Sequence, residues 1–290
     1  MSFVLTRYIE NITIDKGFAE SLASELRSNH ISEGVILMVA KKIELESSYT
    51  LSYNDPGQVD IPGQYDIVIV ADQLKSKEGQ IGRIDLTGRR GRHPPKQKTG
   101  EKGDDAKEQG GEAVSAIDGN VGTIGDAGGK GRTGNNIKLF CNELGMIEIF
   151  ANGGFGGKGG VGGDGGKGGN GAMVTINHHK QKLPPAAGGN GAMGGIGGDG
   201  GNAGLIKGFF CKADSGIIFQ SVGGLPGDAG EGGQAGEGGR LDDEHGPDGH
   251  PGAKPTIIGT RGSSSTISVN QVEYTELWER VVTELNIPTG

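Results

Sequence analysis

The residues best suited to chemistry gather in one short stretch near the C-terminus. "LDDEHGPDGH", residues 241–250, holds four acidic side chains and two histidines. Loops rich in carboxylate oxygens bind hard cations, and two histidines together can bind a transition metal. The spacing matches no defined cation loop, so a solvated acidic loop is the default interpretation. We predict no metal centre, and whether this loop takes a cation stays open.

Two further stretches come close to a calcium pattern. "GGVGGDGGK" (159–167) and "GGIGGDGGN" (194–202) nearly match the nonapeptide of calcium-binding β-rolls, but glycine stands at Gly166 and Gly201, where that pattern needs a large apolar residue. G-x-G-x-x-G recurs without the strand–turn–helix context that gives it meaning. No serine–histidine–acid set or paired carboxylates can be nominated. We therefore expect no catalytic residues and no cofactor, that is, a protein that is not an enzyme.

Composition narrows the class of protein further. Glycine accounts for 60 of the 290 residues, only 33% are hydrophobic, and the net charge is −8. An acidic chain is a poor partner for nucleic acid, and no apolar run approaches the ~18 residues of a membrane span. The start "MSFVLTRYIENITID" lacks the features of a signal peptide. We expect cytoplasmic synthesis without membrane insertion, followed by incorporation into a virion or release from the cell.

Short apolar stretches repeat along the chain. "ILMVAKKI" (36–43), "IVIVADQL" (67–74) and "IKLFCNEL" (137–144) share one pattern, and "KGFFCKAD" (207–214) keeps its middle. Such runs are typical of strands, and their recurrence predicts rungs stacked into a solenoid or a small sheet. The alternative is a set of ordinary hairpins in an α+β domain.

One small residue marks the same place in each copy: Ala40, Ala71, Cys141 and Cys211. If the last two copies were adjacent strands, ~4.8 Å apart, Cys141 and Cys211 could form a disulfide. Ala71 at the same place favours a small buried residue instead. The sequence does not decide between a bridge and two thiols.

Long glycine tracts follow the later copies, and they are periodic. In "GGFGGKGGVGGDGGKGG" (153–169) glycine fills every third place, and the period recurs in 119–134, 188–200 and 224–239. Three residues per turn is the period of a polyproline-II helix, which leaves its backbone polar groups to be paired from outside. Glycine on one side lets such helices approach and bond to one another. The tracts therefore predict an antiparallel bundle of polyglycine-II helices, with a flexible linker or a trimeric collagen stalk as alternatives.

The predicted fold class is thus mostly β and irregular: stacked β-rungs carry the polyglycine-II bundle, with a short α-helix near each end. Asp15 is a plausible N-cap for a helix over 15–29, and Asn270 with Glu273 resembles a capping box for the second helix. The predicted regions are a β-rich base with one helix (1–87), a polar mobile loop (88–118), the glycine-rich bundle with interleaved rungs (119–255), and a C-terminal strand with an amphipathic helix (256–290).

Over roughly 119–252 the chain resembles the polyglycine-II sandwich of T-even-type phage tail-fibre adhesins. It is also similar to the glycine-rich antifreeze proteins of springtails and, more loosely, to collagen-like proteins. In the phage adhesins the loops at the far end of the bundle touch the host receptor. The resemblance implies the same role for the end loops of this chain.

Two sets of residues are candidates for binding. The stretch 172–187 must join two antiparallel tracts, and exposed loops on a rigid scaffold often bind partners. Within it we select Asn177, His178, His179, Lys180 and Gln181, with a plain connecting loop as the alternative. The terminal helix carries an apolar stripe that either packs on the base or docks to an assembly, formed by Leu277, Trp278, Val281 and Leu285.

These expectations favour a non-enzymatic structural and binding protein that presents end loops to a protein or glycan receptor on a cell surface. One alternative is a purely structural subunit or spacer, whose partners are its neighbours in an assembly. Another is the scaffold part of a secreted toxin or effector.

Overall fold

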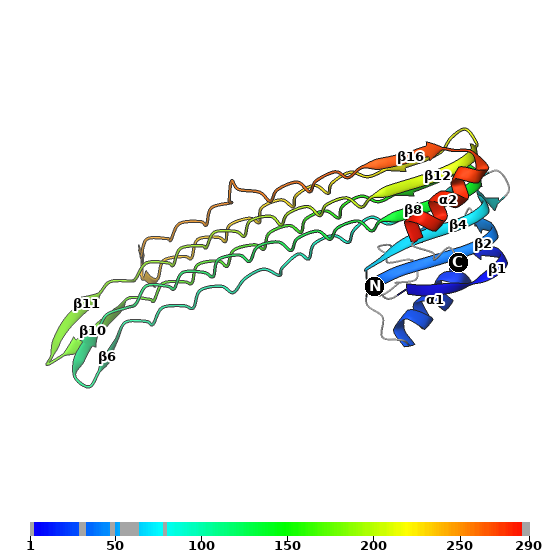
Figure 1. The fold of residues 1–290 in the computed structure, drawn as a ribbon. Helices are drawn as coiled ribbons and strands as arrows, with labels where there is room; N and C mark the ends of the chain where they lie inside the picture. The colour runs from blue at the N-terminus through cyan, green and yellow to red at the C-terminus, as the bar shows by residue number, and fades with distance from the viewer. Residues whose placement is uncertain (1–2, 29–32, 47–49, 53–63, 78–79, 286–290) are drawn as a thin grey trace.

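A computed structural model describes residues 3–28, 33–46, 50–52, 64–77 and 80–285. The chain forms a base of strands at one end, from which a long, narrow arm projects (Figure 1). The strands of the base lie in parallel sheets, and the described residues contain two helices. The expectation of a mostly β protein with one helix near each end is therefore confirmed.

The base has a larger and a smaller parallel sheet. In the larger sheet the order is β1-β2-β4-β8-β12-β16. Its strands are β1 (Phe3–Ile14), β2 (Glu33–Leu45), β4 (Gln64–Ser76), β8 (Ile137–Leu144), β12 (Ile206–Ala213) and β16 (Ile267–Gln271). The smaller sheet has the order β13-β9-β5-β3, formed by β3 (Thr50–Ser52), β5 (Gly82–Asp85), β9 (Ile147–Phe150) and β13 (Ile218–Gln220).

The register of the larger sheet confirms the repeat found in the first three copies. Ala40 pairs with Ala71, and Ala71 pairs with Cys141. All three side chains are buried, as a small residue at a crowded place should be. The downstream match also holds, because Phe219 of β13 pairs with Ile149 of β9.

The fourth copy lies one residue away from the predicted alignment. Phe210, and not Cys211, pairs with Cys141. This register pairs Ile206 with Ile137 and stacks the rings of Phe209 and Phe140, whose centroids are 5.8 Å apart. A slip of one residue moves a side chain to the other face of the sheet.

The two cysteines are accordingly separated by the sheet. Cys141 belongs to the core between the sheets, whereas Cys211 packs against the cluster on the outer face. Both thiols are free, which settles the question of a disulfide. Burial raises the pKa of the Cys141 thiol to about 12, so this side chain is an inert core residue.

The main core lies between the two sheets and under α1 (Lys16–Ser28). Its buried aliphatic residues include Ile67 and Ile137 of the larger sheet, Ile149 of the smaller sheet and Leu26 of α1. The Asp15 carboxylate Oδ1 accepts the Phe18 N–H at 2.8 Å, so the predicted N-cap is confirmed.

The second helix, α2 (Tyr274–Leu285), covers the outer face of the larger sheet, where Leu277 and Val281 pack against Phe140 and Phe209. The predicted capping box is wrong. Asn270 lies in β16, and the helix begins later, with the Leu277 N–H bonded to the Glu273 carbonyl at 2.9 Å. Pairing with β12 keeps Asn270 extended.

The arm consists of extended segments that run side by side in two layers (Figure 1). We call the segments that leave the smaller sheet the outgoing layer: 86–106, 151–171 and 221–239. We call the segments that lead into the larger sheet the returning layer: 115–136, 184–205 and 246–266. Within a layer the segments are parallel, and across the layers they are antiparallel. Each layer of the arm therefore continues one sheet of the base.

The structure corrects the prediction of a loop over 88–118. The Gly91 N–H bonds to the Phe155 carbonyl and the Gly100 N–H to the Asp164 carbonyl, each at 2.8 Å, so this stretch begins as an arm segment. It then turns through the hairpin of β6 (Lys107–Gln109) and β7 (Glu112–Val114). The period was hidden because Pro94, Gln97 and Ala106 take places that glycine holds elsewhere.

The stretch 119–255 contributes to both the base and the arm. The base draws β8, β9, β12 and β13 from the stretch 119–255, as well as strands from 1–87 and 256–290. Base and arm are thus built from alternating pieces of the same chain.

Candidate recognition site

The glycine pairs explain how the arm holds its shape. In the segment 151–171, the Gly156 N–H bonds within its layer to the Leu225 carbonyl, and the next residue, Gly157, bonds across the layers to the Gly129 carbonyl, both at 2.8 Å. The same alternation repeats every three residues along the segment. Two of every three N–H groups are thereby paired between segments. This satisfies the backbone donors, which need hydrogen-bond partners when they are buried.

The remaining place in each triplet points outward, and its N–H often meets an acidic or amide side chain. Asp164 Oδ1 accepts the Gln234 N–H at 2.8 Å. In the returning layer, Asp199 Oδ1 accepts the Thr260 N–H at 2.7 Å. The same bond is made by the side-chain oxygens of Asn152, Asn170, Asn190 and Asn202 to the N–H groups of Val222, Arg240, His250 and Ser263.

The period of the glycines alone does not reveal this ladder of side chains. Asn152 and Asn170 lie 70 residues before Val222 and Arg240, which is also the spacing of the strand repeat. The coincidence of the two spacings was the available signal. The ladder also accounts for the near-match to a calcium pattern, because Asp164 and Asp199 bind backbone N–H groups of this chain.

Electrostatics agree with these contacts. The Lys96 ammonium beside Asp164, followed by the Gln234 N–H, lowers the pKa of that carboxyl group. For Asp199, the hydrogen bond from the Thr260 N–H is the first cause of its lowered pKa. Both carboxylates are therefore stabilised in their charged form within the folded arm.

Hairpins close the arm at the end far from the base. They are β6–β7, the hairpin of β10 (Ala172–Ile176) and β11 (His179–Leu183), and that of β14 (Arg240–Leu241) and β15 (Glu244–His245). Val174 and Leu183 of the second hairpin are buried with Ala106, which precedes the first. This small apolar cluster holds the first two hairpins together, so that the tip is an ordered unit.

All five residues selected for binding lie in the β10–β11 hairpin and are exposed. Asn177 and His178 form its turn with φ of 51° and 66°, a left-handed pair typical of a type I′ turn. His179, Lys180 and Gln181 follow in β11, where Lys180 pairs with Thr175. The structure thus brings the predicted set together at the far end of the arm.

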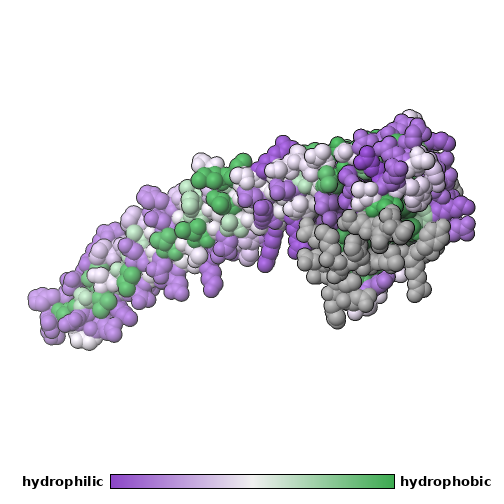
Figure 2. All heavy atoms as spheres, viewed as in Figure 1, coloured by the Kyte–Doolittle hydropathy of each residue, from purple (hydrophilic) through white to green (hydrophobic). Residues whose placement is uncertain are grey.

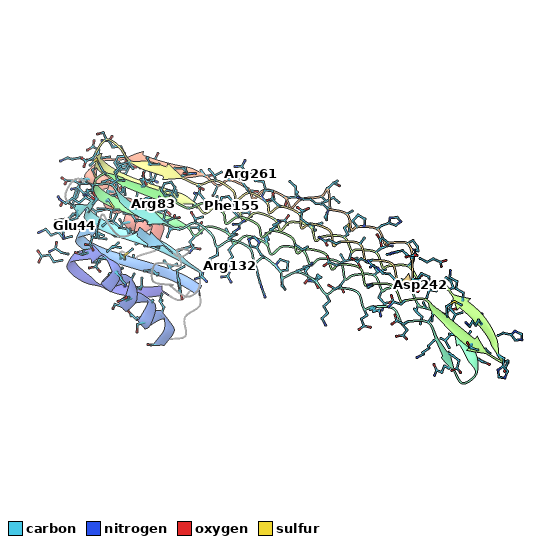
Figure 3. All side chains as sticks on the ribbon, turned by 180° about the vertical axis from the view of Figure 1, so that it is seen from behind. Glu44, Arg83, Arg132, Phe155, Asp242 and Arg261 are labelled. Carbon is cyan, nitrogen blue, oxygen red and sulfur yellow. The ribbon has the colours of Figure 1, made fainter. Side chains whose placement is uncertain are left out.

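The acidic stretch 241–250 also lies toward this end, with Asp242 in the β14–β15 turn (Figure 3). Glu244 forms a salt bridge with Lys182 of β11, and Asp248 Oδ1 accepts the Gly238 N–H at 2.8 Å. Within the described residues, no three His, Cys, Asp or Glu side chains gather closely enough to hold a metal ion. The loop's carboxylates thus serve partly to tie hairpins together.

The second candidate set divides between the core and the surface. Leu277 and Val281 are buried against the larger sheet, and Leu285 packs partly on the same cluster. The prediction that they dock to a neighbour is wrong for these two buried residues, because no partner can reach them. Trp278 is 44% exposed, and its ring meets that of Tyr274 edge-on at 6.3 Å.

Comparisons with known proteins assign no family. No family model matches the chain, and the comparison with curated proteins gives no match. Among solved structures, the chain is similar at 22% identity to the nine polyproline type II helical bundle antifreeze protein of the springtail Granisotoma rainieri. That likeness covers 55% of this chain and 97% of the other, with a TM-score of 0.11. Neither helix of the described chain has the length and hydropathy of a membrane-spanning segment.

Proposed function

We propose that this protein is a non-enzymatic scaffold whose arm presents the tip hairpins to a protein or glycan on a cell surface. The observation that carries the proposal is the position of Asn177–Gln181, exposed at the far end of a hydrogen-bonded arm. Their side chains offer amide, imidazole and ammonium groups that can bind hydroxyls or carboxylates.

The proposal includes a finer description of the fold. We infer that the arm segments are polyglycine-II helices, because donors to each neighbour recur every third residue. We also infer that the base is a β-solenoid. The strands of both sheets follow the chain in the same order, which is the expectation for successive coils.

A stiff arm would favour binding at its tip. Ordering a flexible loop on binding costs free energy that reduces affinity. Here the cluster of Ala106, Val174 and Leu183 packs the first two hairpins together before any partner binds, and the Lys182–Glu244 salt bridge links the second hairpin to the third. The exposed side chains of the β10–β11 hairpin are thus positioned on a packed support before binding.

A cell-binding assay tests this function. Labelled protein is offered to a panel of intact cells and to a glycan array. One variant has Asn177, His178, His179, Lys180 and Gln181 replaced by glycine and serine. A control variant, Lys212→Ser, changes an exposed residue of the base. We expect the tip variant to lose binding and the control to keep it, with equal melting temperatures. Binding that survives the tip replacement would contradict the proposal.

An exposed aromatic pair favours a second candidate function, that of a subunit in a larger assembly. Tyr274 and Trp278 are 49% and 44% exposed on the same side of α2. Such aromatic residues are enriched where proteins meet. If Trp278→Ser removes the protein from its native assembly while the tip variant leaves it in place, the assembly function is the better description.

A further inference from the structure

The two outer surfaces of the arm differ in character. The outward places of the outgoing layer are rich in charge, with Lys158, Asp164, Lys167, Asp228, Glu231 and Glu237, and their exposed apolar residues Phe155 and Leu225 stand among these charges. The outward places of the returning layer also hold polar residues such as Asn190 and Asp199, but between these they carry a strip of apolar side chains: Val121, Ile124, Ala127, Met193, Ile196 and Ala253. We call this strip the returning face. Figure 2 shows hydrophobic side chains running along the visible side of the arm.

The hydrogen bonds fix the orientation of this face. Gly122 and Gly125 donate to the neighbouring segment 184–205, and Thr123 donates across the layers to Lys98. The places left over, Val121 and Ile124, therefore point away from both neighbours. They are 61% and 60% exposed, and Met193 and Ile196 of the adjacent segment are 45% and 44% exposed. Large exposed apolar strips on a soluble protein mark interaction surfaces.

We propose that the returning face binds the returning face of a second copy of this chain, with the two arms antiparallel. The charges on the face favour this occupant. Asp118 lies six residues before Ile124 and Lys130 six residues after it, all on the outward places of one segment. A two-fold axis that crosses the arm at Ile124 places Asp118 opposite the partner's Lys130, and the reverse.

The same axis passes beside Met193, because the Gly125 N–H bonds to the Met193 carbonyl at 2.9 Å and so sets the two residues at one level. Met193 then faces its own copy, and thioether side chains adapt well to each other. Outward side chains recur about every 9 Å along each segment, so this register sets each outward residue of the central segment opposite an outward residue of the partner.

The size of the whole contact, which extends beyond the returning face to Asp118 and Lys130, suits a dimer. Residues 118–133 at ~3.1 Å each span about 50 Å. Three segments ~4.8 Å apart give a strip about 15 Å wide. The resulting area is comparable with the ~800 Å² that each partner buries in a standard interface. The antiparallel arrangement points the two tips in opposite directions, so each chain keeps its own hairpins free.

Sedimentation of the full chain over a range of concentrations tests the dimer. We expect a concentration-dependent dimer, and we expect Ile124→Glu to raise its dissociation constant about tenfold or more. Phe155→Glu is the matched control, because Phe155 is 53% exposed on the opposite surface of the arm. A wild-type chain that stays monomeric at its highest soluble concentration would overturn the proposal. Equal effects of both substitutions would exclude the returning face.

A charge exchange tests the register. Lys130→Glu and Asp118→Lys should each weaken the dimer, and the double variant should recover most of the loss. Because Asp118 also accepts the Ala187 N–H, thermal melts accompany each variant. A double variant weaker than either single one would refute the antiparallel alignment. Ile124→Cys gives an independent reading, since a short bis-maleimide should join two copies at this position and fail to join two copies of Phe155→Cys.

Discussion

At some places in the arm only glycine fits, because any side chain there would collide with a neighbouring segment. A Cβ atom on Gly163 would lie 1.9 Å from the Lys98 carbonyl oxygen, far inside van der Waals contact. Three residues earlier in the same segment, a Cβ atom on Gly160 would meet nothing nearer than Pro94 Cγ at 3.1 Å. The period-three pattern alone does not distinguish these two glycines, whereas the neighbouring segments do.

We therefore predict that Gly163→Ala lowers the free energy of unfolding by about 3 kcal/mol, because the segments must move apart. Gly160→Ala should change it by less than about 1 kcal/mol, since the smaller strain is offset by lost freedom in the unfolded chain. Denaturant titration of both variants measures the difference. Equal destabilisation would argue against close packing of the segments at Gly163.

The acidic residues of the ladder predict a pH dependence. Asp105 belongs to the same ladder, because its Oδ1 accepts the Asn170 N–H at 2.7 Å. The folded-state pKa values of Asp105, Asp164 and Asp199 lie below the ordinary value for aspartate, owing to hydrogen bonds from lysine or from backbone N–H groups. In the acidic range the unfolded chain then binds more protons than the folded chain. The stabilising effect of these three carboxylates is complete at pH values above the ordinary pKa of aspartate. It is lost as pH falls through their lowered folded-state pKa values.

We expect the melting temperature to fall as pH drops below about 4. Asp199→Asn should reduce this dependence while keeping the fold, because an asparagine oxygen can still accept the Thr260 N–H, as Asn202 does for Ser263. Melting curves from pH 7 to pH 3 of the wild type and the variant provide the test. An unchanged slope in Asp199→Asn would mean that this carboxylate does not contribute.

In α2, the residues of one apolar stripe occupy two different environments. Leu277 is buried on the larger sheet, and the adjacent Trp278 faces solvent. At the far end of the helix, Glu284 forms salt bridges with Lys138 of β8 and Lys207 of β12. These contacts attach α2 to the base along its length.

We predict that Leu277→Ala lowers the free energy of unfolding by about 2–4 kcal/mol through the cavity it leaves. Trp278→Ala, one residue away, should change it by no more than about 0.5–1 kcal/mol, as expected for a surface substitution. Chemical denaturation of the two variants distinguishes burial on the base from docking to a partner. A large loss for Trp278→Ala in the isolated chain would contradict its exposed position.

In the whole molecule, the segments of the arm differ in how many neighbours support them. Segments 151–171 and 184–205 have partners on both sides within their layers, whereas 86–106 and 246–266 lie at the edges. We predict that amides such as Gly157 and Gly198 exchange more slowly than Gly91 and Gly262 at matched distance from the base. Hydrogen exchange followed by mass spectrometry can resolve these segments. Uniform, rapid exchange along the whole arm would show that it is not an ordered body.

Much of this architecture could be predicted from the sequence, because the three-residue period of the glycines and the spacing of the strand repeats indicate it. The register of Ala40, Ala71 and Cys141 and the N-cap at Asp15 followed from local patterns. The first arm segment did not, since Pro94 and Gln97 interrupt the glycine period between Gly91 and Gly100. The slip at Cys211 depends on the stacking of Phe209 on Phe140, a contact between distant strands that no local pattern reveals.

Because each sheet of the base continues into one layer of the arm, the length and the width of the arm depend on different features of the sequence. Reach depends on how many glycine triplets lie between a strand and its hairpin, whereas breadth depends on how many coils the base contains. A duplication of the 70-residue unit between Ile67 and Ile137, whose ends already pair in register, would add one outgoing and one returning rod in the interior. Such a protein would become broader at unchanged reach, and selection could adjust the two properties separately.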